Sequence, residues 1–291
     1  MSEKAMLFVH ALTGLHPGSG TALGVVDLPV QRERHTQWPV IPGSSLKGVL
    51  RDACARRTKR DDPPLLTVFG PETSSASDHA GALALTDARI LAFPVRSLRG
   101  VFAWVTCPAV IQRLSRDLVL AGRDGLASLP PVAKDQAACA DNSPLLVDGD
   151  KLVLEEFEFA RAGDAAPIAD WVARHAVQDA ATQGRIQDHL AVLHDDDFTH
   201  FVRHATEVVA RVGLDYEKKT VRSGALFYQE FLPPETLFYS LVFAEDGRRK
   251  DPKMTAAQVL GYVQKNVPPV LQIGGDETIG RGLCAVRLAS E

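Results

Sequence analysis

The sequence contains no apolar run long enough to cross a membrane, and it does not begin with the basic and then apolar pattern of a signal peptide. Cysteine is scarce, and its widely spaced residues form no CxxC pair. This spacing argues against a zinc knuckle and a disulfide framework, and it predicts free thiols in a reducing cytosol. We therefore expect a cytoplasmic protein with no zinc site and no membrane partner. The cysteines are Cys54, Cys107, Cys139 and Cys284.

Positive charge is not in excess, since 32 Lys and Arg residues stand against 36 Asp and Glu residues, for a net charge of −4. A negative total argues at first against nucleic-acid binding, but the distribution is uneven. Residues 31–60 hold eight basic and two acidic side chains, whereas residues 141–207 hold fourteen acidic and five basic ones. A basic face and an acidic face suit a polyanion on one side and head-to-tail packing of copies.

The 291 residues, 45% of them hydrophobic, are enough for a sizeable core. Apolar periodicity predicts helices at 44–57, 108–120, 255–265 and, in pieces, 167–204. Alternating or short apolar runs predict strands at 5–13, 82–93, 100–106, 151–160, 207–214, 225–231, 236–244, 270–273 and 283–288. Polar residues predict a loop at 59–77 and a turn at 215–224.

The order strand, helix, strand, strand, helix within 5–120 is the start of a ferredoxin-like unit. We therefore predict an α+β fold with a ferredoxin-like, RNA-recognition-like core. Its elements come from about 5–120 and 225–291, and a helical insertion occupies about 121–205.

The stretch from His16 to Arg51 carries the strongest chemical signals. One carboxylate, Asp27, precedes a basic run that includes Arg32 and Arg34. A turn aspartate that caps its own backbone is the commoner role for an isolated Asp. A carboxylate presented to RNA could instead accept the proton of a 2′-OH or hold Mg²⁺ or another divalent cation.

A glycine, two hydroxyls and a lysine converge at the start of the helix predicted from residue 44. Ser44, Ser45, Lys47 and Arg51 could be a helix cap with solvated charges. Backbone N–H groups at a helix start are also a good seat for phosphates, and we favour that interpretation.

The late loop, residues 273–282, repeats this composition. Its Gly274, Gly275 and Arg281 could form an ordinary hairpin turn. Paired with the first stretch, they predict a place where the backbone approaches RNA closely because no side chain intrudes.

Three further residues are candidate helpers in catalysis. His16 precedes a Pro-Gly pair and could assist proton transfer, although a loop imidazole bonded to the backbone is the simpler interpretation. Tyr228 and Glu230 are two apart on a predicted strand, so they could line one surface.

The segment 194–204 contains histidines at 200 and 204, a workable spacing for a metal on a helix. An apolar stripe of Phe198, Phe201 and Val202 and three aspartates at the start favour a solvated amphipathic helix instead.

Several motifs carry a family resemblance. Residues 42–51, together with the late glycine loop, resemble the RAMP proteins of CRISPR effector complexes. The segments 24–36, 93–106 and 224–239 narrow the resemblance to the family of the fourth Cmr protein, the repeated backbone subunit of type III-B complexes. Nearly the whole chain is covered, and the middle is the least similar part.

The resemblance implies a single RAMP domain over 1–291, with palm and thumb insertions and the thumb hairpin at about 208–226. It implies several copies stacked along CRISPR RNA, other Cmr subunits as partners and guide-paired, single-stranded target RNA as the substrate. It further implies that Asp27 cleaves that RNA. Gln229 and Phe231 stand where the family often has a second acid and a tyrosine, which puts a catalytic role of this strand in doubt.

Three other functions stay open at this point. The subunit could be purely structural, or it could be a CRISPR RNA-processing endoribonuclease, an activity that usually relies on histidine. A metal-dependent enzyme centred on 194–204 is the third alternative.

Overall fold

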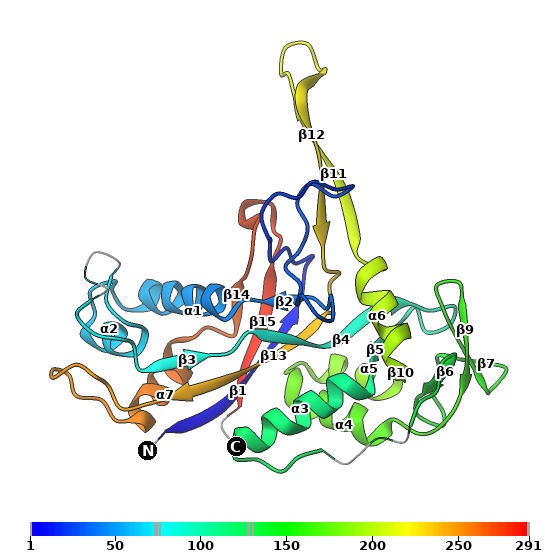
Figure 1. The fold of residues 1–291 in the computed structure, drawn as a ribbon, viewed down its shortest axis with the longest axis horizontal. Helices are drawn as coiled ribbons and strands as arrows, with labels where there is room; N and C mark the ends of the chain where they lie inside the picture. The colour runs from blue at the N-terminus through cyan, green and yellow to red at the C-terminus, as the bar shows by residue number, and fades with distance from the viewer. Residues whose placement is uncertain (1, 73–74, 76, 127–128, 130, 290–291) are drawn as a thin grey trace.

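The computed structural model describes residues 2–72, 75, 77–126, 129 and 131–289. Its body is built on a curled, mixed sheet of thirteen strands, from which a separate two-stranded hairpin projects (Figure 1). The chain is therefore α+β, as predicted. No helix in the described part is both long and apolar enough to cross a membrane.

Four antiparallel neighbours form the centre of the sheet in the order β15, β1, β13, β4. They are β1 (Glu3–Ala11), β4 (Ala88–Arg96), β13 (Leu237–Ala244) and β15 (Leu283–Ala289). Helices α1 (Gly43–Arg57) and α7 (Ala256–Asn266) pack together beside these strands. Seven consecutive residues at the end of β1 are buried, which is typical of a strand covered on both faces.

This arrangement corrects the order predicted for 5–120. The strand expected at 100–106 exists as β5 (Phe102–Thr106), but β13 rather than β5 lies between β1 and β4. Helix α3 (Pro108–Leu120) begins and ends where predicted, with proline at its first turn. It packs against β4.

Short strands β2 (Val40–Ile41), β3 (Leu83–Leu85) and β14 (Val270–Gln272) extend the centre of the sheet. The strand predicted at 82–93 is therefore divided between β3 and β4, because the chain bends at Thr86 and Asp87. Helix α2 (Pro63–Phe69) was missed inside the loop predicted at 59–77. Two prolines suit its first turn, and three of its apolar side chains are buried, namely Leu65, Val68 and Phe69.

The insertion at 121–205 contains helices, as predicted, and it also carries strands that continue the sheet. Strand β10 pairs in parallel with β5, and the remaining strands follow it. These strands are β6 (Gln136–Ala138), β7 (Leu146–Val147), β8 (Lys151–Leu154), β9 (Phe157–Arg161) and β10 (Leu190–Leu193). The helices are α4 (Ala166–Ala176), α5 (Ala180–His189) and α6 (Asp195–His204). The strand predicted at 151–160 is divided by a turn in which Glu155 has a φ of 48°.

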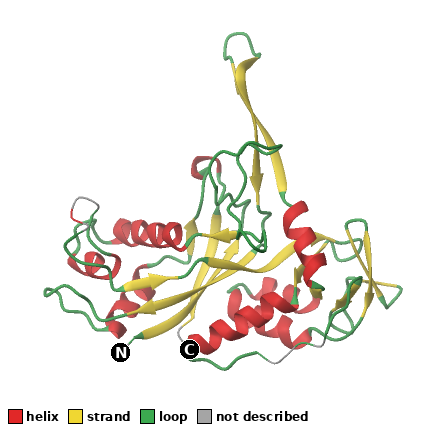
Figure 2. Ribbon diagram, in the orientation of Figure 1, coloured by secondary structure: helices red, strands yellow, loops and turns green. Residues whose placement is uncertain are grey.

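The hairpin predicted at 208–226 is present and longer than expected. It consists of β11 (Glu207–Leu214) and β12 (Val221–Phe231), so part of the polar turn predicted at 215–224 belongs to a strand. Only strands and loops build this projection, whereas the helices lie in the body (Figure 2). One face of the hairpin carries exposed apolar side chains: Val208, Val212, Leu214, Val221, Leu226 and Tyr228.

All four cysteines are free and buried, as predicted. Burial raises the pKa of their thiols, most clearly for Cys107 and Cys284. None of these thiols is therefore prepared to act as a nucleophile at neutral pH.

Candidate nucleic-acid interface

Asp27 lies at the foot of the hairpin. Its backbone N–H donates to the Tyr228 carbonyl at 3.1 Å, and its Oδ2 accepts a hydrogen bond from the Tyr228 N–H at 2.7 Å. The next residue, Leu28, forms a bridge with Gln229. The half-buried Asp27 carboxylate is thus fixed beside the exposed Tyr228 ring by backbone contacts.

Residues 27–38, which we call the strap, are clamped to the same strand by Glu230. Its Oε2 accepts from the Val30 N–H at 2.9 Å, and its Oε1 accepts from Arg32 at 2.6 Å and from Thr206 at 2.9 Å. The Glu230 side chain is 6% exposed. Tyr228 and Glu230 therefore do not line one accessible surface, and Glu230 holds the fold together instead.

The same contacts correct the prediction that Arg32 binds RNA. Its guanidinium donates to Glu230 and to the carbonyls of Gln37 and Val202, at 2.9 and 2.8 Å. Arg34, two residues on, is exposed, and the described part of the chain shows no partner for its side chain. Of the two arginines, only Arg34 is free to meet a phosphate.

His16 is a buried packing residue. Its Nδ1 donates to the Glu230 carbonyl at 2.6 Å, and its ring lies 5.6 Å from that of Phe231. The side chain is 7% exposed, which does not match the helper role predicted for it. The simpler interpretation, an imidazole bonded to the backbone, is the one observed.

The late glycine loop packs on the His16 turn. A Cβ on Gly274, whose φ is +82°, would lie 2.3 Å from the His16 carbonyl oxygen. The Gly275 N–H donates to that oxygen at 3.0 Å. Arg281 stacks over Phe231, with its guanidinium carbon 4.6 Å from the ring centroid. Contact between two protein loops therefore accounts for the glycines predicted to approach RNA.

Sequence reasoning missed Asp276 in this loop. Its carboxylate accepts from Arg211 at 2.8 Å and from Gln229 at 2.7 Å, so it binds both strands of the hairpin. The sequence signal that could have identified it is an aspartate in a glycine-rich turn. Aspartate tolerates the left-handed backbone conformation that Asp276 adopts, with a φ of 65°. Together with Asp27 and Glu230, it is the third carboxylate that anchors the hairpin.

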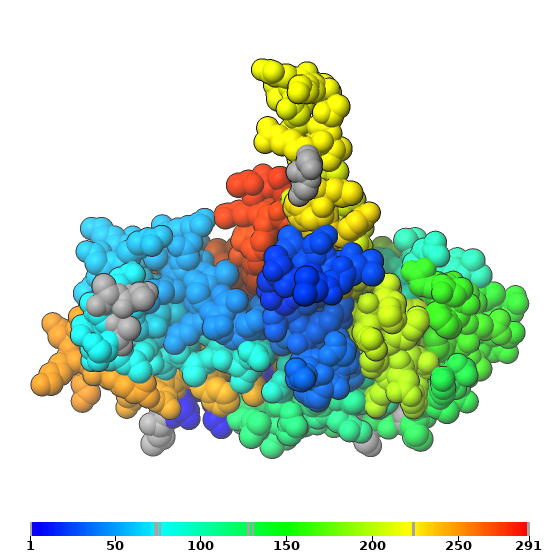
Figure 3. Space-filling model, turned by 45° about the horizontal axis from the view of Figure 1, so that its top comes forward, coloured from blue at the N-terminus to red at the C-terminus, as the bar shows by residue number. Residues whose placement is uncertain are grey.

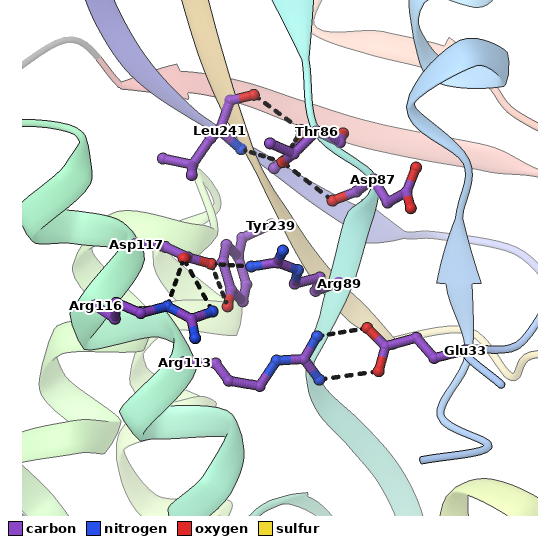
Figure 4. Close-up of polar contacts among 10 residues, drawn as sticks. Glu33, Thr86, Asp87, Arg89, Arg113, Arg116, Asp117, Tyr239 and Leu241 are labelled. Carbon is purple, nitrogen blue, oxygen red and sulfur yellow. Dashed lines mark hydrogen bonds and ion pairs between the residues drawn. The ribbon is translucent and has the colours of Figure 1, made fainter. Parts of the chain in front are cut away.

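A buried ionic cluster holds the outer part of the strap to the body (Figure 4). Arg113 on α3 donates two hydrogen bonds to Glu33, at 3.0 and 2.5 Å. Burial acts to raise the pKa of Glu33, but the bonds from Arg113 and Thr36 outweigh it, and the pKa is lowered. Beside this pair, Asp117 accepts from Arg89 and from the Tyr239 hydroxyl.

The start of α1 presents hydroxyls and a cation to solvent. Ser44 and Ser45 are exposed in the first turn, and Pro42 rather than a serine is the N-cap. The Gly43 N–H donates to Asp87 at 2.8 Å. A Cβ on Gly43 would lie 2.8 Å from the Leu85 carbonyl oxygen, so this glycine serves packing against β3.

Lys47 and Arg51 differ in their partners. Arg51 donates to the Pro71 carbonyl at 3.0 Å and pairs with Glu72 at 3.2 Å. For Lys47, the described residues provide no hydrogen bond and no ion pair. Burial, with the charges of Arg51 and Arg248, lowers the pKa of Lys47. A phosphate at this place would supply the missing negative charge.

The groups around Asp27 determine whether a divalent metal ion could bind there. Nowhere in the described ranges do three or more His, Cys, Asp or Glu side chains gather so that they could hold a metal. Mg²⁺ is usually held by one or two carboxylates together with substrate phosphates and water. Asp27, whose Oδ1 has no recorded partner among the described residues, fits as the single protein ligand of an ion shared with RNA.

The model of the RAMP superfamily matches residues 8–285. The chain belongs to the RAMP superfamily. Within it, the chain is 42% identical over 282 residues to the Cmr endoribonuclease Cmr4 of Pyrococcus furiosus, covering 96% of this chain and 94% of that protein. It is 26% identical to the CMR subunit Cmr4 of Saccharolobus solfataricus, with the same coverage. The resemblance to RAMP proteins proposed from the sequence is thereby confirmed.

Solved structures of RAMP proteins share the fold. The crystal structure of oligomeric Cmr4 from Pyrococcus furiosus superposes with a TM-score of 0.76 and 34% identity over the aligned residues, covering 99% of this chain and 98% of that one. A chain of the type III-B Cmr-beta complex bound to cognate target RNA superposes with a TM-score of 0.75 and 22% identity, covering 98% and 96%. This second likeness concerns the fold alone.

Proposed function

We propose that this chain is the repeated backbone subunit of a type III-B CRISPR RNA-guided complex. In that role it binds CRISPR RNA, stacks with copies of itself and with other Cmr subunits, and cleaves guide-paired target RNA through Asp27. Support comes from the 42% identity to a Cmr4 endoribonuclease and from the likeness to an oligomeric Cmr4.

The proposed architecture is a single RAMP domain over 1–291 with a ferredoxin-like core. The order β1, α1, β4, β13, α7, β15 along the chain, with β1 and β13 central, is the βαββαβ pattern of that fold. The segment 121–205 is inserted between the halves of this core. The thumb is the hairpin of about 208–226, and it would enter the guide–target duplex and splay a base.

The observation that carries the catalytic proposal is the position of Asp27 at the foot of the hairpin. A base step opened by the hairpin would leave its phosphodiester free to adopt an in-line geometry. The 2′ oxygen would attack phosphorus and the bond to the 5′ oxygen would break, giving a 2′,3′-cyclic phosphate and a 5′-OH. The Asp27 carboxylate, fixed by the Tyr228 N–H, would accept the 2′ proton.

A divalent cation, Mg²⁺ or a similar ion, is part of this proposal. Bound between Asp27 and the RNA, it would neutralise the charge that develops on the phosphate. Cleavage should then stop in the presence of a chelator, while complex assembly and target binding persist.

The decisive variant is Asp27→Asn. Asparagine keeps an acceptor for the Tyr228 N–H and removes the negative charge. A complex built only from this variant should assemble and bind target RNA, but cleave it about 100- to 1000-fold more slowly, which corresponds to roughly 3–4 kcal/mol of transition-state stabilisation.

Asp215→Asn is the matched control. Asp215 also accepts backbone hydrogen bonds within the hairpin, from Glu217 and Lys218 at 3.0 and 2.8 Å, but it lies at the tip. A complex built from the Asp215→Asn variant should cleave target RNA at the normal rate. Normal cleavage by the Asp27→Asn complex would leave a purely structural, RNA-binding backbone subunit as the better description.

The third candidate function is CRISPR RNA processing. Such enzymes usually rely on an accessible histidine, and His16 is buried against Glu230 and Phe231. This geometry favours target cleavage. Cutting of free repeat RNA by the isolated chain would reverse that preference.

A further inference from the structure

The segment 194–204, singled out for its histidines, contributes an exposed ring cluster that the proposed function leaves unused. The Phe157 ring lies 5.0 Å from His200, and His200 lies 4.8 Å from His204. Both histidines are exposed, and the Phe157 side chain is 38% exposed. Phe201 lies beneath them, buried and perpendicular to Phe157, so the cluster rests on a rigid base.

These rings line a hollow of about 320 Å³. The other residues that line it are Glu155, Glu156, Ala205 and Thr206. Ala205 and Thr206 connect α6 directly to β11, so the hollow opens at the foot of the hairpin. In the space-filling view, the surface of α6 (yellow-green) lies below the hairpin and beside the N-terminal loops (Figure 3).

The position of the hollow is coupled to that of Asp27. The Thr206 hydroxyl donates to Glu230, and the same carboxylate holds the Val30 N–H of the strap. The wall of the hollow and the strap, which begins at Asp27, are therefore fixed to one buried group. A nucleotide displaced at the hairpin would be close to both.

The chemistry of the hollow favours a base over a phosphate. Aromatic rings and imidazoles are the side chains on which unpaired bases stack. Glu155 is paired with Arg96 at 2.8 Å, whereas Glu156 is exposed and would repel a phosphate while accepting from an exocyclic amine. Partial desolvation, with the charges of His200, Arg203 and Arg32, lowers the pKa of His204, which favours the neutral form of that ring.

We propose that the hollow formed by Phe157, His200 and His204 binds the unpaired RNA base that the hairpin displaces. This inference rests on the proposed function, since it requires RNA at the hairpin. A metal is not the occupant we infer, because in the described ranges no third ligand joins the two histidines.

The first test is zero-length cross-linking in the assembled complex. Single 4-thiouridines are placed at successive positions of the target RNA and, in a second series, of the guide RNA. Irradiation should link one position per hairpin to peptides that contain Phe157 or His200. The series in which the link appears identifies the strand that supplies the base.

The second test is a double-mutant cycle that combines a change in the protein with a change in the RNA. The double variant His200→Ala with His204→Ala should bind intact RNA about tenfold more weakly, in line with the usual loss of one base stack. RNA that is abasic at the cross-linked position should be bound equally well by both proteins. His79→Ala, a histidine outside the hollow, is the control and should behave as the unaltered chain.

The proposed function and the base-binding hollow can fail separately. A complex that neither binds nor cuts target RNA would overturn the proposed function. A complex that binds and cuts normally, without cross-links to these peptides and with equal losses for intact and abasic RNA, would overturn only the base-binding hollow. The melting temperature of the double variant should be unchanged, because the His200 and His204 side chains are exposed.

Discussion

The foot of the hairpin and the outer face of α1 carry similar residues, and the structure uses them differently. Both regions combine glycine with cations, and both were predicted to contact RNA. At the foot of the hairpin, Arg32 is hydrogen-bonded to Glu230, and Gly274 is packed against the His16 carbonyl. On α1, Lys47 is half-buried among other cations, with no negative partner recorded in the described part of the chain.

This difference distinguishes residues whose protein partners fix the hairpin in place from residues whose polar groups are free to contact RNA. A buried cation requires a partner, because the cost of desolvating an unpaired charge is several kcal/mol. Arg32 meets this requirement through Glu230, so its charge is already neutralised. Half-buried Lys47 and exposed Arg34 have no such partner among the described residues, so a phosphate can still pair with them, and the exposed hydroxyls of Ser44 and Ser45 lie on the same helix start as Lys47.

The largest effect expected at the hairpin foot is that of Gly274→Ala. The added Cβ would meet the His16 carbonyl oxygen at 2.3 Å, and alanine at a φ of +82° is strained as well. The free energy of unfolding should fall by about 3 kcal/mol or more, as is typical when strain and a backbone clash combine. Urea denaturation of the purified chain measures this loss.

Substitutions at two other glycines of the same loop distinguish the cost of a positive φ from the cost of the clash with His16. Gly280 also has a positive φ of +76° but has open space around it, so Gly280→Ala should cost only about 1 kcal/mol. Gly275→Ala, whose Cβ would lie 3.4 Å from the His16 ring, should cost less still. Equal losses for all three would show that the His16 turn does not constrain the loop.

The next effect is that of Arg32→Met. Methionine retains the apolar stem and leaves the Glu230 carboxylate buried without its main counter-charge. Breaking such a pair typically costs about 3 kcal/mol or more. The exposed pair of Arg56 with Asp52 provides the contrast, and Arg56→Met should cost less than about 0.5 kcal/mol. A small loss at Arg32 would mean that the clamp is solvated and the arginine available to RNA.

Local sequence signals predicted most of the helices and strands but not which strands pair with one another. Helices α1 and α3 were located within a residue because a proline lies at or just before the start of each and periodic apolar side chains follow it. Strand β10 was missed because a four-residue apolar run between two helices cannot be told from helix by periodicity. The place of β13 between β1 and β4 depends on contacts more than 100 residues apart, which no local pattern records.

The candidate site shows the same limit. A lone aspartate before a basic run indicated Asp27 only through the family resemblance, since capping is the commoner role. Its contact with Tyr228 joins positions 201 residues apart. The roles of Arg32 and Glu230 could not be read from their motifs, because whether a charge is buried depends on Val30, Thr206 and α6 closing around it.

The smallest effect, and the one that sharpens the contrast with Arg32, is that of Lys47→Met on RNA binding. Burial and the neighbouring charges lower the pKa of Lys47, so its charge opposes folding and its removal should not reduce stability. Loss of one phosphate contact should weaken binding to every RNA sequence by about 1 kcal/mol and reduce the slope of log affinity against log salt by about one. Titrations at several salt concentrations measure both quantities. Lys134→Met, which removes an exposed lysine outside α1, should change neither. If the two variants show the same slope as the unaltered chain, the uncompensated charge on α1 is not a phosphate seat.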